Sequence, residues 1–451
     1  MMFKKVLIAN RGEIALRINR ACQELGVRTV AIFSEADRQS LHVRQADEAF
    51  CVGPGPVPHS YLNIPNIIST ALVTKCDAIH PGYGFLSESA RFASICADHG
   101  LTFIGPKPHV IAAMGDKATA KRVMKDAGVA TTPGTDILSS VDEARRAAKK
   151  LGCPVLLKAT AGGGGKGMRV VAQLDDLERA YAGATAEAEA SFKDGRLYME
   201  KLIVDPRHIE VQVLGDDFGN VVQLGERDCS MQKPSHQKLI EEAPAANLSG
   251  KVRKHLHDMA LRACKHVGYT NAGTLEFLVS GDDVYFMEMN TRIQVEHPVT
   301  EMVYGIDLVK EQIRIAAGET LGYGQSDLVA RGHAIECRIN AEDSRNNFAP
   351  QAGTLAKVMF PGGPGIRVDT AVYSGASIPP YYDSMMAKVV AYGDTRDAAI
   401  ARMDRALRET VVEGVNTTVA ACLEILATRE FREGRYDIGF LPRLMAAAAV
   451  G

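Results

Sequence analysis

Short apolar runs alternate with longer amphipathic segments from residue 3 to about residue 125, and this rhythm limits the possible folds most strongly. The first cycle has an apolar run at 6–9, an amphipathic segment at 13–25 and another apolar run at 29–33. Such alternation predicts β-α-β units and a parallel sheet covered on both faces. The turn after the first run, Asn10-Arg11-Gly12-Glu13, lacks the GxGxxG pattern. A dinucleotide site is therefore not expected there.

The remaining chain divides into two further regions. Turn residues gather at 131–135, and strand patterns follow at 155–159, 168–172 and 197–201. We expect this stretch to form a separate, lid-like subdomain. From residue 204 onward strand patterns dominate, with helices expected at 251–267, 308–317 and 396–410. The predicted fold mixes α/β and α+β structure in three domains, 1–130, 131–203 and 204–451.

Composition narrows the class of protein. The 451 residues are 46% hydrophobic and 24% charged, which suits a globular protein with two or three cores. A net charge of -2 offers no global field for nucleic acid or an anionic membrane. Nine scattered cysteines without a CxxC spacing suit a reducing cytosol and argue against structural zinc. The N-terminal apolar run is too short for a signal peptide or a membrane span, so we expect a cytoplasmic protein.

A glycine-rich segment at 155–168 has the chemistry of a phosphate-binding loop. It contains a strand pattern that ends at Lys158, four glycines at 162–165 and a second strand pattern. Glycines let backbone N–H groups approach phosphate oxygens closely, and Lys158 adds a positive charge. A flexible hairpin without a ligand is the alternative. A Walker A loop is excluded because no Gly-Lys-Ser/Thr follows.

The most informative segment, residues 273–292, predicts a β-hairpin that brings two carboxylates together. With Gly281-Asp282-Asp283 as the loop, the facing pairs are Ser280–Val284, Leu278–Phe286 and Glu276–Glu288. Like charges at such a position, with Cβ atoms roughly 5 Å apart, destabilise a sheet unless a cation lies between them. The segment therefore predicts a cation at Glu276 and Glu288.

The ligands available at this hairpin indicate which cation. Hard oxygen ligands select Mg²⁺ or Mn²⁺. Asn290 should lie on the same face and supply a third oxygen, and Arg292 follows on that face if the strand continues. The alternative is a solvated acidic pair on an exposed hairpin. Leu278 and Phe286, expected on the same face, argue against a wholly wet surface.

Three other segments carry polar residues whose role the pattern alone leaves open. Alternation at 334–339 places Glu336 and Arg338 on one strand face, where either is also compatible with an ordinary surface group. Lys238 follows a turn-rich stretch that suits an anion site or a solvated connection. His208 is more typical of a polar residue at the start of a strand than of a ligand. Cys229 has no adjacent base that would mark it as a nucleophile.

Taken together, the segments closely resemble the biotin carboxylase family over essentially the whole chain. The matching stretches are Ile8 to Ala15, His80 to Glu88, Met114 to Lys117, Glu288 to His297 and Pro379 to Met385. The resemblance implies an ATP-grasp fold with a Rossmann-like N-terminal domain, a mobile lid and a β-rich C-terminal domain. It also implies an ATP-dependent ligase that carboxylates biotin with bicarbonate, as the first half-reaction of an acetyl-CoA or related carboxylase.

The resemblance also assigns roles to individual residues. For ATP it implies Lys117, Lys158, Gly164, Gly165, Glu200, Lys201, Ile203, His208, His236, Glu276 and Glu288. For two Mg²⁺ or Mn²⁺ ions it implies Glu276, Glu288 and Asn290. For bicarbonate it implies Lys238, Arg292, the Val295 backbone and Arg338. Glu296 is the implied general base, Arg338 is implied to face the ureido oxygen of biotin, and Tyr83 is implied to contact biotin.

The family's mechanism has two halves. Glu296 deprotonates bicarbonate, which attacks the γ-phosphorus of ATP and forms carboxyphosphate. Carboxyphosphate gives CO₂ and phosphate, the phosphate removes the biotin N1′ proton, and Arg338 stabilises the resulting oxyanion. No Ala-Met-Lys-Met biotinylation motif is present, so a separate biotin carboxyl carrier protein is expected. Carboxyltransferase subunits and a homodimer are the other expected partners.

The sequence departs from the family at two places. Lys233-Pro234-Ser235 stands where relatives usually carry two arginines before His236, and Lys166 stands where arginine is frequent.

Two other functions remain as alternatives. One is a different ATP-grasp carboxylate ligase, and the other is a regulatory nucleotide-binding subunit without turnover. The final acceptor, whether acetyl-CoA, propionyl-CoA or pyruvate, is left open.

Overall fold

The computed structural model describes residues 1–160 and 168–450, and Gly164 and Gly165 lie outside the described residues. The N-terminal alternation produces a five-stranded parallel sheet in the order β3-β2-β1-β4-β5. Its strands are β1 (Lys5–Ile8), β2 (Arg28–Ser34), β3 (Glu48–Gly53), β4 (Ala78–His80) and β5 (Thr102–Phe103). Its helices are α1 (Gly12–Glu24), α2 (Leu41–Gln45), α3 (Ile64–Val73) and α4 (Ala90–Asp98).

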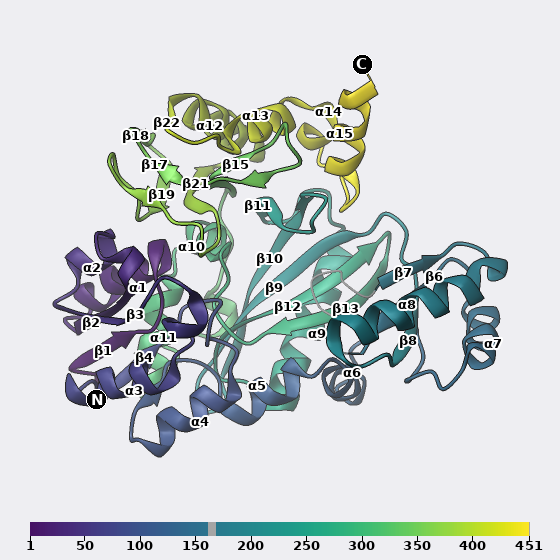
Figure 1. The fold of residues 1–451 in the computed structure, drawn as a ribbon, viewed down its shortest axis with the longest axis horizontal. Coiled ribbons are helices and arrows are strands. Elements are labelled where there is room, and N and C mark those ends of the chain that lie inside the picture. Colours follow the sequence, from purple (N-terminus) through teal and green to yellow (C-terminus); the bar gives the residue numbers. More distant parts are fainter. Residues whose placement is uncertain (161–167, 451) are drawn as a thin grey trace.

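The stretch expected to be a lid forms its own small sheet and core. Figure 1 shows it projecting to the right of the rest of the molecule. The sheet has the order β7-β6-β8, and helices α7 and α8 pack on it around buried Leu157, Ala184 and Met199. The elements are α7 (Val141–Leu151), β6 (Val155–Ala159), β7 (Met168–Val171), α8 (Leu177–Phe192) and β8 (Leu197–Lys201). The three predicted strands of this stretch are confirmed.

An eight-stranded antiparallel sheet forms the centre of the molecule, in the order β13-β12-β9-β10-β11-β14-β21-β19 (Figure 1). Its strands are β9 (Arg207–Gly215), β10 (Val221–Gln232), β11 (Lys238–Ala243), β12 (Asn271–Ser280), β13 (Asp283–Asn290), β14 (His333–Asn340), β19 (Ile366–Thr370) and β21 (Met385–Gly393). One face packs on α5 (Pro108–Gly115), α6 (Lys117–Asp126) and α9 (Gly250–Val267). The other face is covered in part by α10 (His297–Tyr304).

The C-terminal end of this sheet is enclosed by helices and short strands. Alternate residues of β14, Ile335, Cys337 and Ile339, enter a core shared with α12 and α13, as their spacing predicted. The helices at this end are α12 (Arg396–Glu409), α13 (Val419–Ala427), α14 (Arg429–Arg432) and α15 (Phe440–Val450). Helix α11 (Leu308–Ala316) instead packs against α1 and β12. The short strands are β15 (Glu342–Asp343), β16 (Ala349–Pro350), β17 (Gly353–Thr354), β18 (Lys357–Met359), β20 (Ser377–Ile378) and β22 (Val411–Glu413).

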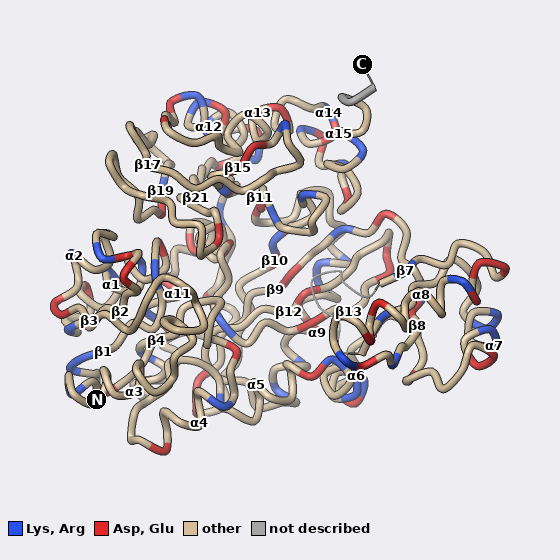
Figure 2. Tube along the Cα trace, viewed as in Figure 1, with Lys and Arg blue, Asp and Glu red and all other residues tan. Residues whose placement is uncertain are grey.

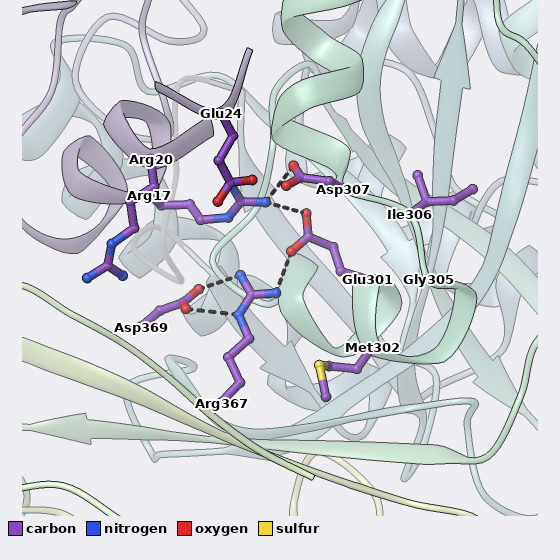
Figure 3. Close-up of a pocket in the computed structure, with 10 residues that line it drawn as sticks. All are labelled: Arg17, Arg20, Glu24, Glu301, Met302, Gly305, Ile306, Asp307, Arg367 and Asp369. Atoms are coloured by element: carbon purple, nitrogen blue, oxygen red, sulfur yellow. Dashed lines mark hydrogen bonds and ion pairs between the residues drawn. The ribbon is translucent and has the colours of Figure 1, made fainter. Parts of the chain in front are cut away.

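A network of ion pairs joins the N-terminal helix to the central sheet (Figure 3). Arg17 of α1 contacts Glu301 of α10 at 2.9 Å and Asp307 at 2.6 Å. Arg367 of β19 contacts the same Glu301 at 2.6 Å and Asp369 at 2.7 Å. Glu301 therefore holds two arginines from distant parts of the sequence, which fixes the parallel sheet against the end of the large one.

Charged residues are distributed as the near-neutral composition predicts. Figure 2 shows acidic and basic positions interspersed along the whole trace, and some of them lie within strands of the large sheet. Among the described residues, no helix has the length and apolar character needed to cross a membrane.

Candidate active site

Four strands carry a row of charged side chains on one face of the large sheet. Glu288 of β13 is the direct cross-strand partner of Glu276 on β12. Glu276 is also the partner of Glu210 on β9, which is in turn the partner of Arg227 on β10. The neighbouring residue Ile209 points to the opposite face, into the core beneath α9. The apolar half of each strand thus anchors the sheet while the charged half forms a site.

The Glu276–Glu288 pairing predicted from the sequence is confirmed, although the hairpin turn is shorter than expected. β13 begins at Asp283, which pairs with Ser280, so the predicted pair Ser280–Val284 is wrong. The turn contains two residues instead of three. A register shift farther along the hairpin restores the alignment of the two glutamates.

The shorter turn also overturns the predicted pair Leu278–Phe286. Leu278 pairs with Tyr285, and Phe286 pairs with Phe277. The two phenylalanine rings meet edge to face, with centroids 6.2 Å apart, inside the core beneath α9. Phe286 therefore does not share the face of the carboxylates. An extra residue on one strand reverses which face the following residues take, and short-range pairing rules do not reveal it.

Lys238 lies at the centre of the acidic row. Its ammonium contacts Glu210 at 2.6 Å, Glu276 at 3.1 Å and Glu296 at 2.5 Å, with only 12% of the side chain exposed. One buried cation thus neutralises carboxylates from β9, β12 and the segment before α10. An anion that enters here competes with the carboxylates for the same ammonium.

Glu296 also receives a guanidinium from the other side. Arg338 of β14 donates to Glu296 at 3.0 Å and to Glu241 of β11 at 2.6 Å. The carboxylate therefore lies between Lys238 and Arg338. Burial favours the neutral acid, but these two cations hold the pKa of Glu296 well below its usual range. Glu296 is ionised at neutral pH, as a base must be.

Arg292 and Val295 complete this part of the site. β13 ends at Asn290, so the strand does not continue to Arg292, but the Arg292 guanidinium still donates to Asn290 at 2.7 Å and to Glu88 at 3.0 Å. Asn290 in turn donates to Glu276 at 2.9 Å. The carbonyl of Val295 accepts a hydrogen bond of 3.0 Å from Lys388.

The two hairpin glutamates have opposite electrostatic environments. Burial alone would raise the pKa of Glu276, but Lys238 and His208 hold it below its usual range. For Glu288, burial and then the charge of Glu276 raise the pKa. His208 Nε2 lies 3.0 Å from Glu276, and ligand atoms of His208, Glu210 and Glu276 lie within 4.8 Å of one another. This donor set, with Glu288 beside it, fits a divalent cation.

Lysines from the lid and from α6 lie near the acidic pair. Glu200 of β8 forms ion pairs with Lys158 of β6, at 2.5 Å, and with Lys121 of α6. Burial and nearby lysines lower the pKa of both Lys158 and Lys121 to about 8. Glu288 is close enough to raise the pKa of Lys158, and Lys117 is close enough to lower that of Glu288. Three lysines therefore converge on the mouth of the site from the lid side.

The other residues that the resemblance assigns to the nucleotide have the following surroundings. Lys201 donates to the carbonyl of Gly152 at 2.7 Å, and Ile203 is half-buried in the segment after β8. His236 is exposed, with a φ of 62°, in the turn between β10 and β11. In the same turn Lys233 is buried and contacts Glu342 at 2.7 Å. The departure from the family's arginines is thus accommodated by an internal ion pair.

Tyr83, assigned to biotin by the resemblance, packs close to the sheet. Its hydroxyl donates to Glu13, and Lys388 lies 6.0 Å from the centre of its ring. Lys388 also contacts Glu13 at 3.1 Å. Lys388 therefore lies near Tyr83 and also donates to the Val295 carbonyl.

Several residues of this cluster were missed by the sequence analysis. Polar residues at every second position of β9 were the signal for Glu210, since His208, Glu210 and Gln212 are all buried. No short-range signal marked the fully buried Arg227 or Lys388. The residues missed are Glu88, Lys121, Glu210, Arg227, Glu241, Gln294 and Lys388.

Comparisons with protein families cover most of the chain. Residues 2–111 match the model "Biotin carboxylase, N-terminal domain" and residues 336–443 match "Biotin carboxylase C-terminal domain". Between them, residues 116–323 match "Carbamoyl-phosphate synthase L chain, ATP binding domain". Among curated proteins, biotin carboxylase 1 of Bacillus subtilis is 54% identical over 443 residues, covering 98% of each chain. Biotin carboxylase of Nostoc sp. is 52% identical over 446 residues, covering 98% of this chain and 100% of that protein.

Solved structures agree with these matches. The complex of biotin carboxylase with β,γ-ATP from Campylobacter jejuni has a TM-score of 0.93 at 49% identity and covers 98% of this chain and 99% of its own. The biotin carboxylase domain dimer of 2-oxoglutarate carboxylase from Hydrogenobacter thermophilus, bound to MgADP, ADP and bicarbonate, has a TM-score of 0.93 at 50% identity and covers 98% of each chain. The predicted ATP-grasp fold is confirmed, and the chain belongs to the biotin carboxylase family.

Proposed function

We propose that this protein is a biotin carboxylase, which uses ATP and bicarbonate to carboxylate biotin. The observation that carries the proposal is the arrangement around Glu296. A buried, ionised carboxylate lies between Lys238 and Arg338, beside the Glu276–Glu288 pair. Cations in this arrangement suit a small anion, and the acidic pair suits the metal that accompanies a nucleotide.

ATP is expected between the lid and the large sheet. Lys117 and Lys158 are the residues proposed for the phosphates, together with Gly164 and Gly165. A buried amine with a pKa near 8, as at Lys158, gains protonation when a phosphate approaches, so nucleotide binding and lysine charging reinforce each other. The residues proposed for adenine and ribose are Glu200, Lys201, Ile203, His208 and His236.

Two Mg²⁺ or Mn²⁺ ions are proposed at Glu276, Glu288 and Asn290. A bound divalent ion would neutralise charge that develops on the phosphates. The protein's own contribution is to hold two carboxylates in direct register despite their repulsion. Lys238 and His208 already compensate the charge of Glu276, which leaves Glu288 as the carboxylate that gains most from a cation.

Bicarbonate is proposed to lie against Lys238, Arg292 and the Val295 backbone. An anion there shares Lys238 and Arg338 with Glu296, which weakens their hold on that carboxylate and raises its pKa. Glu296 thereby becomes a stronger base when the substrate is present. It removes the bicarbonate proton, and the bicarbonate oxygen attacks the γ-phosphorus to give carboxyphosphate and ADP.

The second half of the reaction is proposed to occur at Arg338 and Tyr83. Carboxyphosphate releases CO₂, and the phosphate takes the N1′ proton of biotin. Arg338 then faces the negative charge that develops on the ureido oxygen, as a fixed donor does in an oxyanion hole.

The proposed partners are a biotin carboxyl carrier protein, carboxyltransferase subunits and a second copy of this chain. The dimeric relative from Hydrogenobacter thermophilus supports a homodimer. Relatives at 51% identity include the small subunit of 2-oxoglutarate carboxylase and a pyruvate carboxylase subunit from Methanothermobacter thermautotrophicus, while others are named only biotin carboxylase. The similarity therefore does not select one final acceptor. We also propose three domains. The N-terminal domain is 1–130, the lid is 131–203, and the lid closes over ATP bound on the region 204–451.

The test is ADP release measured with and without free biotin at fixed bicarbonate, and again with bicarbonate left out. A biotin carboxylase should show slow ADP release that biotin accelerates and that stops without bicarbonate. A different ATP-grasp ligase would respond to neither, and a regulatory subunit would show no turnover in any condition.

A further inference from the structure

Two buried glutamates lie behind Arg338, and the roles proposed so far use neither. Glu241 of β11 and Glu336 of β14 are direct cross-strand partners, and neither is exposed to solvent. They lie on the sheet face beneath α10, where Ala243 and Ala334 form an apolar cluster with the helix. Two carboxylates in this position, without water around them, repel each other strongly if both are ionised.

Their hydrogen bonds differ sharply. Glu241 Oε1 accepts from Arg338 at 2.6 Å through Nε and contacts a terminal guanidinium nitrogen at 2.5 Å. Glu336 accepts no hydrogen bond at either oxygen from any described residue. One member of the pair is thus held by the guanidinium, while the other is a buried carboxyl without a donor.

The charged groups that face Glu336 do not compensate it. On its own strand Arg338 is engaged by Glu241 and by Glu296, the residue before α10. On β21, Lys388 is engaged by Glu13 of α1 and by the Val295 carbonyl.

Two further groups complete these surroundings. Asp369 of β19 contacts Lys388 at 3.8 Å, and His297 of α10 is buried and neutral, because burial and nearby cations lower its pKa. Burial raises the pKa of Glu336 well above its usual range and that of Glu241 to about 7. Arg338 opposes the shift at Glu241.

We propose that Glu241 and Glu336 share a single proton, which resides on Glu336, so that ionised Glu241 positions Arg338 for the biotin half-reaction. Glu241 Oε1 lies within hydrogen-bond distance of both Nε and one terminal nitrogen, and these charge-assisted contacts hold the guanidinium in place. Neutral Glu336 keeps a second negative charge away from it. This inference rests on the proposed function only for the assignment of Arg338 to biotin.

Glu241→Gln and Glu336→Gln are a matched pair of isosteric variants at facing positions. Glu336→Gln replaces a neutral acid by a neutral amide and should change every rate by less than about threefold. Glu241→Gln removes a charge-assisted contact to Arg338 and should lower kcat/KM for biotin roughly ten- to hundredfold. Bicarbonate-dependent ADP release without biotin should stay within a few fold of wild type.

Infrared spectroscopy reports the proton independently of activity. At neutral pH the spectrum should contain a protonated carboxylic acid carbonyl band that disappears in Glu336→Gln and persists in Glu241→Gln. The infrared measurement remains decisive if wild-type protein shows no biotin-stimulated turnover, a result that would overturn the proposed function alone. Should Glu241→Gln fail to fold, the infrared band and the rates of Glu336→Gln still show whether the proton resides on Glu336.

Three results would overturn the inference. One is a band unchanged in Glu336→Gln, which would place the proton elsewhere. Another is a loss of biotin turnover in Glu336→Gln as large as that in Glu241→Gln. The third is a folded Glu241→Gln with wild-type kcat/KM for biotin, which would remove its positioning role.

Discussion

At the scale of single residues, the two central charges of the site, Lys238 and Glu296, each have more than one partner. Lys238 contacts three carboxylates and Glu296 contacts two cations. A substrate anion can therefore exchange with an internal partner without leaving any group unpaired, which keeps the desolvation cost of binding low. Two residues, Arg338 and Lys238, allow the halves of the proposed reaction to be tested separately.

Arg338→Gln should separate biotin carboxylation from ATP cleavage. The amide can still donate a hydrogen bond but cannot offset charge on the ureido oxygen. Loss of one such donor costs about 2.7 to 4 kcal/mol, so carboxybiotin formation should fall roughly 10²- to 10³-fold. A slow bicarbonate-dependent ATPase should remain. Both activities are measured on one preparation. Because Arg338 also faces the bicarbonate site, a modest decrease in the ATPase is expected, whereas a parallel collapse of both activities would limit Arg338 to the bicarbonate half of the reaction.

Lys238→Gln should raise the bicarbonate requirement far more than the ATP requirement. A lost charge-assisted contact to an anion is worth about 1.5 to 3 kcal/mol, or roughly one to two powers of ten in affinity. Lys233→Gln is the matched control, because Lys233 is also a buried, ion-paired lysine but faces Glu342. The control should lose stability while keeping its KM for bicarbonate. Equal weakening of both substrates in Lys238→Gln would contradict the assignment.

At the scale of elements, the β12–β13 hairpin determines that two carboxylates face each other in the site. The register that aligns Glu276 with Glu288 depends on a two-residue turn and a bulge acting together. This arrangement holds two like charges together, because burial and the charge of Glu276 raise the pKa of Glu288 and Lys117 offsets only part of that rise. The two glutamates should therefore respond differently to substitution.

Glu288→Gln should abolish metal-supported ATP cleavage without lowering stability, since it relieves repulsion from Glu276. Glu276→Gln should also abolish cleavage, but it removes the partner of Lys238 and His208 and should destabilise the fold. Breaking a buried pair of this kind costs about 3 to 5 kcal/mol. Thermal unfolding and ADP release at ordinary Mg²⁺ are the measurements. Asp282→Asn at the exposed hairpin tip is the control, and near-normal turnover in either glutamate variant would exclude the metal site.

The bounds of regular helices and strands were predictable from the sequence, whereas the pairing between distant strands was not. Periodicity predicted β6, β8, α9 and α12 nearly to the residue, since each buries one regular apolar face. The β12–β13 register was only partly predictable, because a bulge depends on packing against the neighbouring strand. Glu336 was visible as a polar residue within a strand, but its neighbour Glu241 comes from a strand 95 positions away. Such pairs become apparent only in three dimensions.

At the scale of the whole molecule, buried ion-pair networks fasten separate parts of the chain together. One network holds α1 against β19 through Glu301. A second centres on Glu242 of β11, which contacts His333 of β14 at 2.6 Å and Arg396 of α12 at 2.7 Å. Tyr436, between α14 and α15, donates to the same carboxylate. Besides the apolar core that they share with the sheet, the C-terminal segments are thus tied to β11 by the Glu242 carboxylate, which makes this part of their attachment sensitive to acid.

Glu242 should make unfolding strongly pH-dependent in acid. Burial opposes its charge, but His333 and Arg396 lower its pKa to about 2, against an ordinary value of 4.5. A lowered folded-state pKa stabilises the protein above the unfolded pKa, and this stabilisation is lost as pH falls from about 4.5 through 2. A shift of this size corresponds to about 3 kcal/mol.

The measurement for Glu242 is the unfolding midpoint of wild type and Glu242→Gln between roughly pH 3 and pH 7, the range in which linkage acts. The variant should be markedly less stable at neutral pH, and its difference from wild type should shrink as the pH falls. Glu409→Gln is the control, because Glu409 pairs with Arg405 on the exposed side of α12, where such pairs contribute at most about 1 kcal/mol. A constant difference between Glu242→Gln and wild type across this range would show that Glu242 stabilises the fold by packing and hydrogen bonding alone, and not through its charge.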